Sequence, residues 1–99
     1  MIVTRLRIQY ADGTLDVVTA DQRDGQAFYL WANRRGIMAP AGRDLSETMQ
    51  TVFLRVCAWN AHQRAQGVTV EWDTWSDRVS YVTVEAAEIV DPTGEGSDE

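Results

Sequence analysis

Apolar and polar residues alternate over the first ten positions and predict a β-strand with one buried face. From Ile2 to Tyr10 every second residue is apolar or threonine, and the residues between them include two arginines and a glutamine. Asp12-Gly13 follows, the pair that a two-residue hairpin turn prefers because both central positions need a positive φ. The chain therefore predicts an N-terminal β-hairpin. Its predicted register pairs Tyr10 with Leu15, Ile8 with Val17 and Leu6 with Thr19 on one face, and Arg7 with Val18 on the other.

The spacing then changes to that of an amphipathic helix between Asp21 and Arg35. Asp21 can cap its start, Asp24 favours its first turn, and Gly36 follows its last residue. Gly25 weakens this helix by up to about 1 kcal/mol relative to alanine. One face of the helix collects Ala27, Phe28, Trp31 and Arg35. The next segment, with glycine at both ends and a proline inside, predicts a loop from Gly36 to Gly42 anchored by Ile37 and Met38.

A longer helix is predicted from Asp44 to Gln66, with Glu47 three residues after Asp44 as in a capping box and Gly67 as the stop. Its apolar positions form one stripe that is widened toward a second side. The stripe consists of Leu45, Met49, Val52, Val56 and Trp59, and the widening residues are Phe53, Leu54, Cys57 and Ala58. A face of this width has to be covered from more than one side, either by the rest of the chain or by a partner.

Beyond Gly67 a short helix capped by Thr69 is predicted from three residues at helical spacing, Trp72, Trp75 and Val79. An extended segment is expected to dock after it through Tyr81, Val82 and Val84. From Pro92 onward too little apolar surface remains to offset the entropy of ordering the chain, which predicts disorder. The elements together predict an α+β fold in which an N-terminal β-hairpin packs with about three α-helices. We expect a single domain over residues 1–85 and an acidic flexible tail over residues 86–99.

Charge is distributed unevenly along the 99 residues, whose formal net charge is −6. All nine bases are arginines, and nine acids balance them within residues 1–84, whereas residues 85–99 carry six acids and no base. A body without net positive charge is a poor binder of polyanions, so nucleic acid is disfavoured as the main partner. No segment is long and apolar enough to span a bilayer, and the start shows neither a secretory signal nor a transit peptide. We therefore expect no membrane association and a cytoplasmic location.

Candidate chemical groups are few. Cys57 is the one cysteine and His62 the one histidine, so an internal disulfide and a Cys/His zinc site are excluded. The two lie off each other's helical face, which favours a core cysteine and an exposed histidine over a catalytic pair. Asp73 and Asp77 share a helical face without a histidine nearby, and this favours a solvated face over a metal or acid/base site. Since no phosphate-binding glycine pattern occurs, the sequence predicts a non-enzyme with no metal and no cofactor.

Four tryptophans are the one compositional excess of the chain. Tryptophan is favoured both in small cores and at the centres of protein interfaces. We assign Trp59 and Trp72 to the core and expect either Trp31 or Trp75 to be partly exposed. An exposed tryptophan would mark a protein-binding patch.

Four segments of the chain follow one another in a recognisable order. They are Asp12-Gly13-Thr14 in the hairpin, Phe53-Leu54-Arg55-Val56-Cys57-Ala58-Trp59-Asn60-Ala61-His62-Gln63-Arg64 closing in Gly67, Trp72-Asp73-Thr74-Trp75-Ser76-Asp77-Arg78-Val79, and Asp91-Pro92-Thr93 in an acidic end. In this order they resemble the small tail assembly chaperones of long-tailed (siphovirus-type) phages and prophages of GC-rich bacteria. The resemblance covers most of the chain.

The resemblance implies a protein without catalytic activity that binds the tape measure protein during tail assembly in the host cytoplasm. A long, apolar, helical client aggregates unless its surface is covered, and an acidic flexible tail adds solubility through charge repulsion. The helical faces of Trp31, Phe53 and Trp75 are the candidate contact sites. Another phage tail protein, or a second copy of this chain, is the alternative partner.

Three other functions compete with this interpretation. A structural protein of the head-tail connector or tail would remain in the virion instead of leaving it. An acidic inhibitor that mimics nucleic acid is suggested by the charge of −6, although that charge lies in the tail. A small enzyme is the weakest alternative because no nucleophile, base or metal ligands cluster in the sequence.

Overall fold

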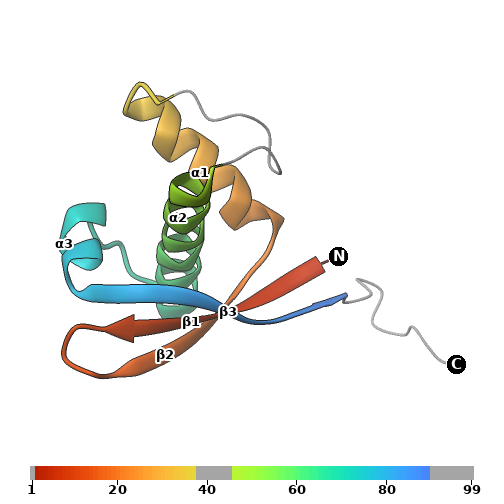
Figure 1. Cartoon of the computed structure of the whole chain (residues 1–99), viewed down its shortest axis with the longest axis vertical. Coiled ribbons are helices and arrows are strands. Elements are labelled where there is room, and N and C mark those ends of the chain that lie inside the picture. Colours follow the sequence, from red (N-terminus) through yellow and green to blue (C-terminus); the bar gives the residue numbers. More distant parts are fainter. Residues whose placement is uncertain (1, 38–45, 90–99) are drawn as a thin grey trace, which may run out of the picture.

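The computed structural model describes residues 2–37 and 46–89, which form three strands and three helices. In chain order these are β1 (Ile2–Tyr10), β2 (Leu15–Ala20), α1 (Gln22–Arg34), α2 (Glu47–Gln66), α3 (Trp72–Asp77) and β3 (Val79–Ile89). The strands form one antiparallel sheet in the order β2-β1-β3, and the helices lie together on one side of it (Figure 1). The α+β class is thus confirmed, and the extended segment after α3 pairs with β1 as a third strand.

Helix α2 is the centre of the fold and contacts each of the other five elements. Its side facing the sheet carries Cys57, Ala58 and Ala61, which are buried against β-strand residues and Trp75. Its side facing α1 carries Val56, which is fully buried with Phe28. The prediction that this helix is covered from more than one side is confirmed.

The hairpin is one residue out of the predicted register. The observed pairs are Arg5 with Thr19, Leu6 with Val18, Arg7 with Val17, Ile8 with Asp16 and Gln9 with Leu15. A slip of one residue exchanges the two faces of a strand. Val18 and Ala20 therefore enter the core, while Leu15 and Val17, which were expected to face inward, are exposed.

The different register follows from a loop of three residues instead of two. The Tyr10 N–H donates to the Thr14 carbonyl at 2.9 Å, and the Gly13 N–H donates to the Tyr10 carbonyl at 2.9 Å. Ala11 and Asp12 thus form a type I turn, and Gly13, with a φ of 92°, adds the left-handed residue that closes a three-residue hairpin loop. An Asp-Gly pair fits both loop lengths, so the pair alone does not select the register.

Helix α1 has the ends that the sequence predicts. Asp21 is the N-cap, and the Asp24 carboxylate accepts a hydrogen bond from the Asp21 N–H at 2.8 Å, which completes a capping box. At the other end Gly36 has a φ of 70°, and the Ile37 N–H donates to the Ala32 carbonyl at 2.9 Å in a Schellman motif. Ile37 is the last described residue of the predicted loop, and Met38 lies outside the described residues.

Two predicted caps are wrong. Helix α2 is capped by Ser46, whose Oγ accepts a hydrogen bond from the Met49 N–H at 3.2 Å, while Asp44 lies outside the described residues. Helix α3 is capped by the backbone of Glu71 instead of Thr69. The predicted stop of α2 is confirmed, since Gly67 has the left-handed φ of 66°.

Strand β3 pairs with β1 along its length from Val79 to Ile89. Val79 therefore opens a strand and does not continue the helix. The boundary expected at residue 86 falls inside β3, and the predicted disorder from Pro92 onward lies outside the described residues. Leu6 pairs with Val84 and Arg5 with Ala86, so Glu85 is an extra residue that forms a β-bulge.

The register leads to a test with two adjacent valines. Val18 is 6% exposed and Val17 is 44% exposed. Val18→Ala should lower the free energy of unfolding by about 2 kcal/mol because it removes buried methyl groups, whereas Val17→Ala should cost less than about 1 kcal/mol. Urea denaturation of both variants measures the difference. A larger loss in Val17→Ala would support the register with a two-residue turn.

Candidate protein-binding surface

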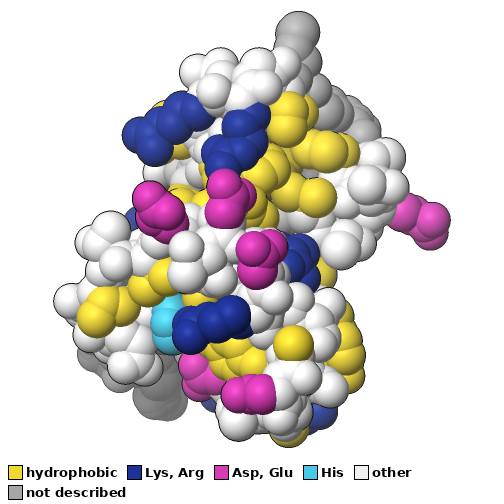
Figure 2. All heavy atoms as spheres, turned by 90° about the vertical axis from the view of Figure 1, so that its left-hand side faces the viewer, with side chains coloured by type: hydrophobic (Ala, Val, Ile, Leu, Met, Phe, Trp, Pro, Cys, Tyr) yellow, Lys and Arg dark blue, Asp and Glu magenta, His cyan; other side chains and the backbone are white. Residues whose placement is uncertain are grey.

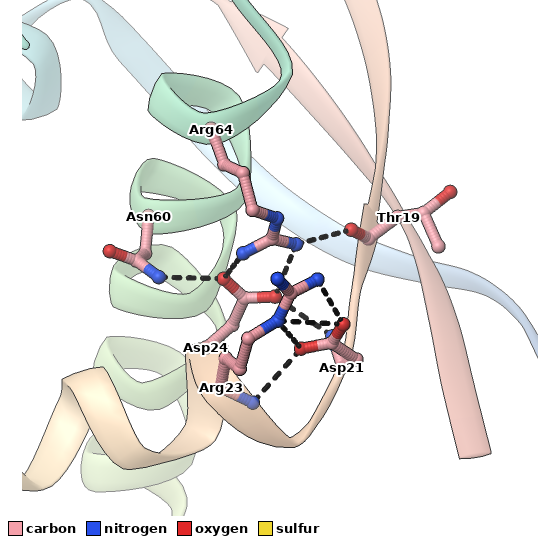
Figure 3. Close-up of polar contacts among 6 residues, drawn as sticks. All are labelled: Thr19, Asp21, Arg23, Asp24, Asn60 and Arg64. Carbon is pink, nitrogen blue, oxygen red and sulfur yellow. Dashed lines mark hydrogen bonds and ion pairs between the residues drawn. The ribbon is translucent and has the colours of Figure 1, made fainter. Parts of the chain in front are cut away.

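A buried carboxylate holds the helices in the positions that shape the surface. Asp24 is fully buried, and its side chain points from α1 toward α2 (Figure 3). The Arg64 guanidinium donates to both carboxylate oxygens, at 2.6 Å and 2.9 Å, and the Asn60 amide donates to Oδ1 at 2.7 Å. Arg64 Nη2 also donates to the Thr19 carbonyl of β2 at 3.2 Å. One network thus joins α1, α2 and β2.

The network satisfies a charge that burial would otherwise penalise. The hydrogen bond from Arg64 to Asp24 raises the pKa of that guanidinium, so the arginine stays charged wherever the protein is folded. Outside the network, the exposed Arg23 side chain pairs at 2.7 Å with Asp21, whose side chain is mostly buried. The two arginines therefore have different roles: Arg64 fixes the packing of α1 on α2, and Arg23 adds a solvated ion pair.

An apolar groove of about 340 Å³ opens between the sheet and the helices beside this network. Residues of β1, the end of β2, α1 and α2 line it: Ile2, Thr4, Leu6, Ala20, Asp21, Gln22, Gly25, Tyr29, Phe53, Leu54 and Cys57. Asp21 is the one charged residue among them, and Arg23 already neutralises it. The groove is therefore a site for apolar side chains.

Phe53, one of the three predicted contact residues, lies in the wall of this groove. Its ring is half-buried and packs edge-to-face on Phe28 of α1 with 5.1 Å between the ring centroids. The groove also includes Gly25, for which the sequence predicted a cost to the helix, and Ile2, for which it predicted only a place in a strand. Neither residue carries a signal in the sequence that identifies a binding site.

Trp75 lies elsewhere and is not a contact residue. Its side chain is 0% exposed in the core between α2 and the sheet, so the prediction of partner contact through Trp75 is wrong. Helix α3 turns this side chain inward. Trp59 and Trp72, which were assigned to the core, pack against the buried core residues but are themselves partly exposed.

Trp31 lines a second groove, on the side of α1 that faces α3. This Trp31 groove has about 360 Å³ and is lined by Ala27, Leu30, Trp31, Arg34, Arg35, Trp59, Asn60 and Trp72. The Arg35 guanidinium carbon lies 4.5 Å from the centre of the Trp31 ring, a cation–π contact. Two arginines among its residues make this groove cationic, in contrast to the apolar groove.

Figure 2 shows the face of the molecule on the α3 side. Hydrophobic side chains gather in its upper half next to arginine side chains, and acidic side chains separate them from a second apolar area below. No single large apolar patch covers this face. The alternation of charge and apolar surface is typical of a solvated surface with local contact sites.

Cys57 and His62 do not form a catalytic pair. Cys57 is buried, as predicted, and burial raises the pKa of its thiol to about 12. His62 is mostly buried, so the prediction of an exposed position is wrong, and its Nδ1 lies 3.7 Å from the Asp16 carboxylate of β2. No local sequence pattern indicates this contact, because the two residues are far apart in the chain. A protonated, buried thiol is a poor nucleophile.

The remaining candidate groups are solvated. Asp73 and Asp77 are both exposed on α3, in agreement with the solvated face that was predicted. Within residues 2–37 and 46–89, no three His, Cys, Asp or Glu side chains are placed to hold a metal ion. Over the same ranges no helix has the length and apolar character needed to cross a membrane.

Comparisons with known protein families, with curated proteins and with solved structures give no match for this chain. A functional interpretation therefore starts from the surface of the molecule. Two of the grooves on the described part of the chain differ in chemistry, one being apolar and neutral and the other aromatic and cationic.

Removing the guanidinium of Arg64 tests the network. Arg64→Ala leaves Asp24 buried without its counter-ion and should lower the free energy of unfolding by about 3 kcal/mol. The matched control Arg23→Ala removes an exposed guanidinium and should cost much less. Chemical denaturation measures both variants, and equal losses would show that burial of Asp24 is unimportant for stability.

The Cys57 thiol should be inert in the folded protein. With a pKa of about 12 the thiolate is scarce at pH 8, and the sulfur is shielded by packing. An aromatic disulfide reagent should label the native protein at least about a hundredfold more slowly than the guanidinium-unfolded protein. Absorbance at pH 8 follows the reaction. Labelling at similar rates in both states would contradict the burial of this residue.

Proposed function

We propose that the chain is a tail assembly chaperone of a long-tailed phage or prophage that binds the tape measure protein and keeps it soluble. The observation that carries the proposal is the amount of apolar surface left uncovered. Eight large hydrophobic side chains of the described residues are between 36% and 64% exposed. One of them, Ile2, lines the apolar groove, which helices and sheet leave open, and another, Leu30, lines the Trp31 groove. The resemblance of four segments to that family points to the same partner.

The physical logic of such a chaperone fits a small, rigid, non-catalytic body. A long apolar helical client aggregates in water, and each copy of a bound chaperone would cover a stretch of it. Such a chaperone acts by binding its client, so the proposed function requires neither catalysis nor a cofactor. Assembly of tails takes place in the host cytoplasm, which is the compartment that the proposal implies.

The predicted contact residues are narrowed by their positions. Phe53 is the primary candidate contact residue because it lines the apolar groove, whereas Trp31 lines the Trp31 groove, which is the competing site. Trp75 is withdrawn because it is fully buried. Acidic mimicry of nucleic acid loses support, since Glu85 pairs with Arg7 at 2.9 Å and Glu88 lies 4.0 Å from Arg5 within the sheet.

Co-expression tests the proposal directly. The tape measure protein encoded in the same genome should be insoluble when expressed alone and should become soluble and co-purify when this chain is present. Arg7→Ala, which breaks a surface ion pair with Glu85 and lines neither groove, is the matched control that should act like the wild type, while the destabilised Arg64→Ala should lose most of the effect. A tape measure protein that stays insoluble with the wild-type chain would overturn the proposal.

The purified virion separates this function from that of a structural protein. A chaperone leaves before the particle is complete, so mass spectrometry of purified phage should not detect this chain in stoichiometric amounts. Finding it there at the copy number of a tail or connector protein would favour the structural alternative.

A further inference from the structure

We infer that the apolar groove binds the uncharged apolar stripe of a client helix through the side chains of that stripe. Gly25 leaves the groove open for these side chains. The inference rests on the proposed function and goes further by naming the docking site and the form of the bound segment. Three features of the molecule support it: the chemistry of the lining, the state of the sheet edges and the space above Gly25.

The lining selects an uncharged segment. Eight of the eleven lining residues are apolar, aromatic or glycine, and the single carboxylate, Asp21, is already paired with Arg23 at 2.7 Å. A charged side chain of a partner would lose its hydration there and find no counter-ion. Apolar side chains gain by leaving water against Ile2, Phe53 and Leu54, so the occupant is an apolar stripe.

Two backbone groups on the outer edge of β2, the strand that ends beside the groove, are already hydrogen-bonded within the chain. Tyr10 and Thr14 form a hydrogen-bonded pair, and such pairs recur at every second residue of an antiparallel ladder. The backbone N–H and C=O groups of Val17 and Thr19 therefore point away from β1. The Asp16 carboxylate accepts from the Val17 N–H at 2.8 Å, and the Thr19 carbonyl accepts from Arg64. β1 is paired on both sides, and β3 carries a bulge at Glu85.

A partner at this site therefore contributes side chains and not a backbone ladder. A helix satisfies its own backbone hydrogen bonds and presents apolar residues at spacings of three and four along one stripe. The client of the proposed function is helical and apolar. The chemistry of the groove and the form of the client thus agree.

Gly25 sets the depth of the groove. It lies within α1, where a glycine weakens a helix, and it has no positive φ that would require one. A Cβ at this position would meet Phe53 Cζ at 3.7 Å, an ordinary contact, so the fold has room for alanine. The missing methyl group leaves space for a side chain of the partner between α1 and Phe53.

Two other surfaces are the competing sites. The Trp31 groove holds Arg34 and Arg35, neither of which forms an ion pair among the described residues, and would favour an acidic segment. The outer face of the sheet presents Leu15 opposite Gln9 of β1 and Val17 opposite Arg7. The most exposed aliphatic residues of the three surfaces are Ile2 at 64%, Leu30 at 60% and Leu15 at 59%.

Four variants, co-expressed with the tape measure protein of the same genome, locate the site. Ile2→Ser and Gly25→Ala alter the apolar groove, while Leu30→Ser and Leu15→Ser are matched controls on the competing surfaces. We expect affinity for the captured client to fall about tenfold in Ile2→Ser and at least about threefold in Gly25→Ala. The controls should stay within about twofold of the wild type. Thermal unfolding checks the fold, and Gly25→Ala should melt no lower than the wild type.

If Gly25→Ala melts no lower than the wild type and still binds the client less tightly, unfolding cannot explain the loss of affinity. Gly25→Ala is therefore the decisive variant. Unchanged binding in both groove variants, or a loss confined to Leu30→Ser or Leu15→Ser, overturns the inference while the proposed function stands. A wild-type dimer that Ile2→Ser converts to a monomer in light scattering also overturns it, because a second copy then fills the groove. A wild-type chain that captures no tape measure protein ends the proposed function and this inference together.

Discussion

The fold depends on one buried carboxylate. Asp24 is the third residue of α1, and it closes the cap of its own helix while binding two side chains of α2. A buried ion pair adds little net stability over an apolar replacement, but it penalises every arrangement in which the carboxylate lacks its donors. Asp24 therefore fixes how α1 lies on α2. Because those two helices form one side of the apolar groove, the same interaction decides the shape of the proposed binding site.

Much of the fold is encoded locally and is readable from the sequence. Caps and stop residues located α1 and the end of α2, and the apolar width of α2 indicated cover from two sides. The register of the hairpin was misread because Val17 and Val18 are adjacent and equally apolar, so alternation fits either face. The cap of α2 was misplaced because Asp44 and Ser46 are both good cap residues two positions apart.

The candidate site was less accessible to sequence reasoning. Phe53 was found because it widens an apolar stripe, whereas Trp75 was misjudged because size and aromatic character do not say which way a side chain points. Contacts between distant residues left no local signal. Asp24 meets Arg64 across 40 positions, and Asp16 meets His62 from another element. The groove exists only once such contacts have brought β1, α1 and α2 together.

The order of the strands also has a consequence for synthesis. The central strand is made first, its hairpin neighbour soon follows, and its other neighbour is made about seventy residues later. As the chain emerges from the ribosome, one edge of β1 stays unpaired until nearly all of the described residues have been translated. During that interval the hairpin is exposed to other nascent chains on the same message. Completion of the sheet is thus a late event in the synthesis of each molecule.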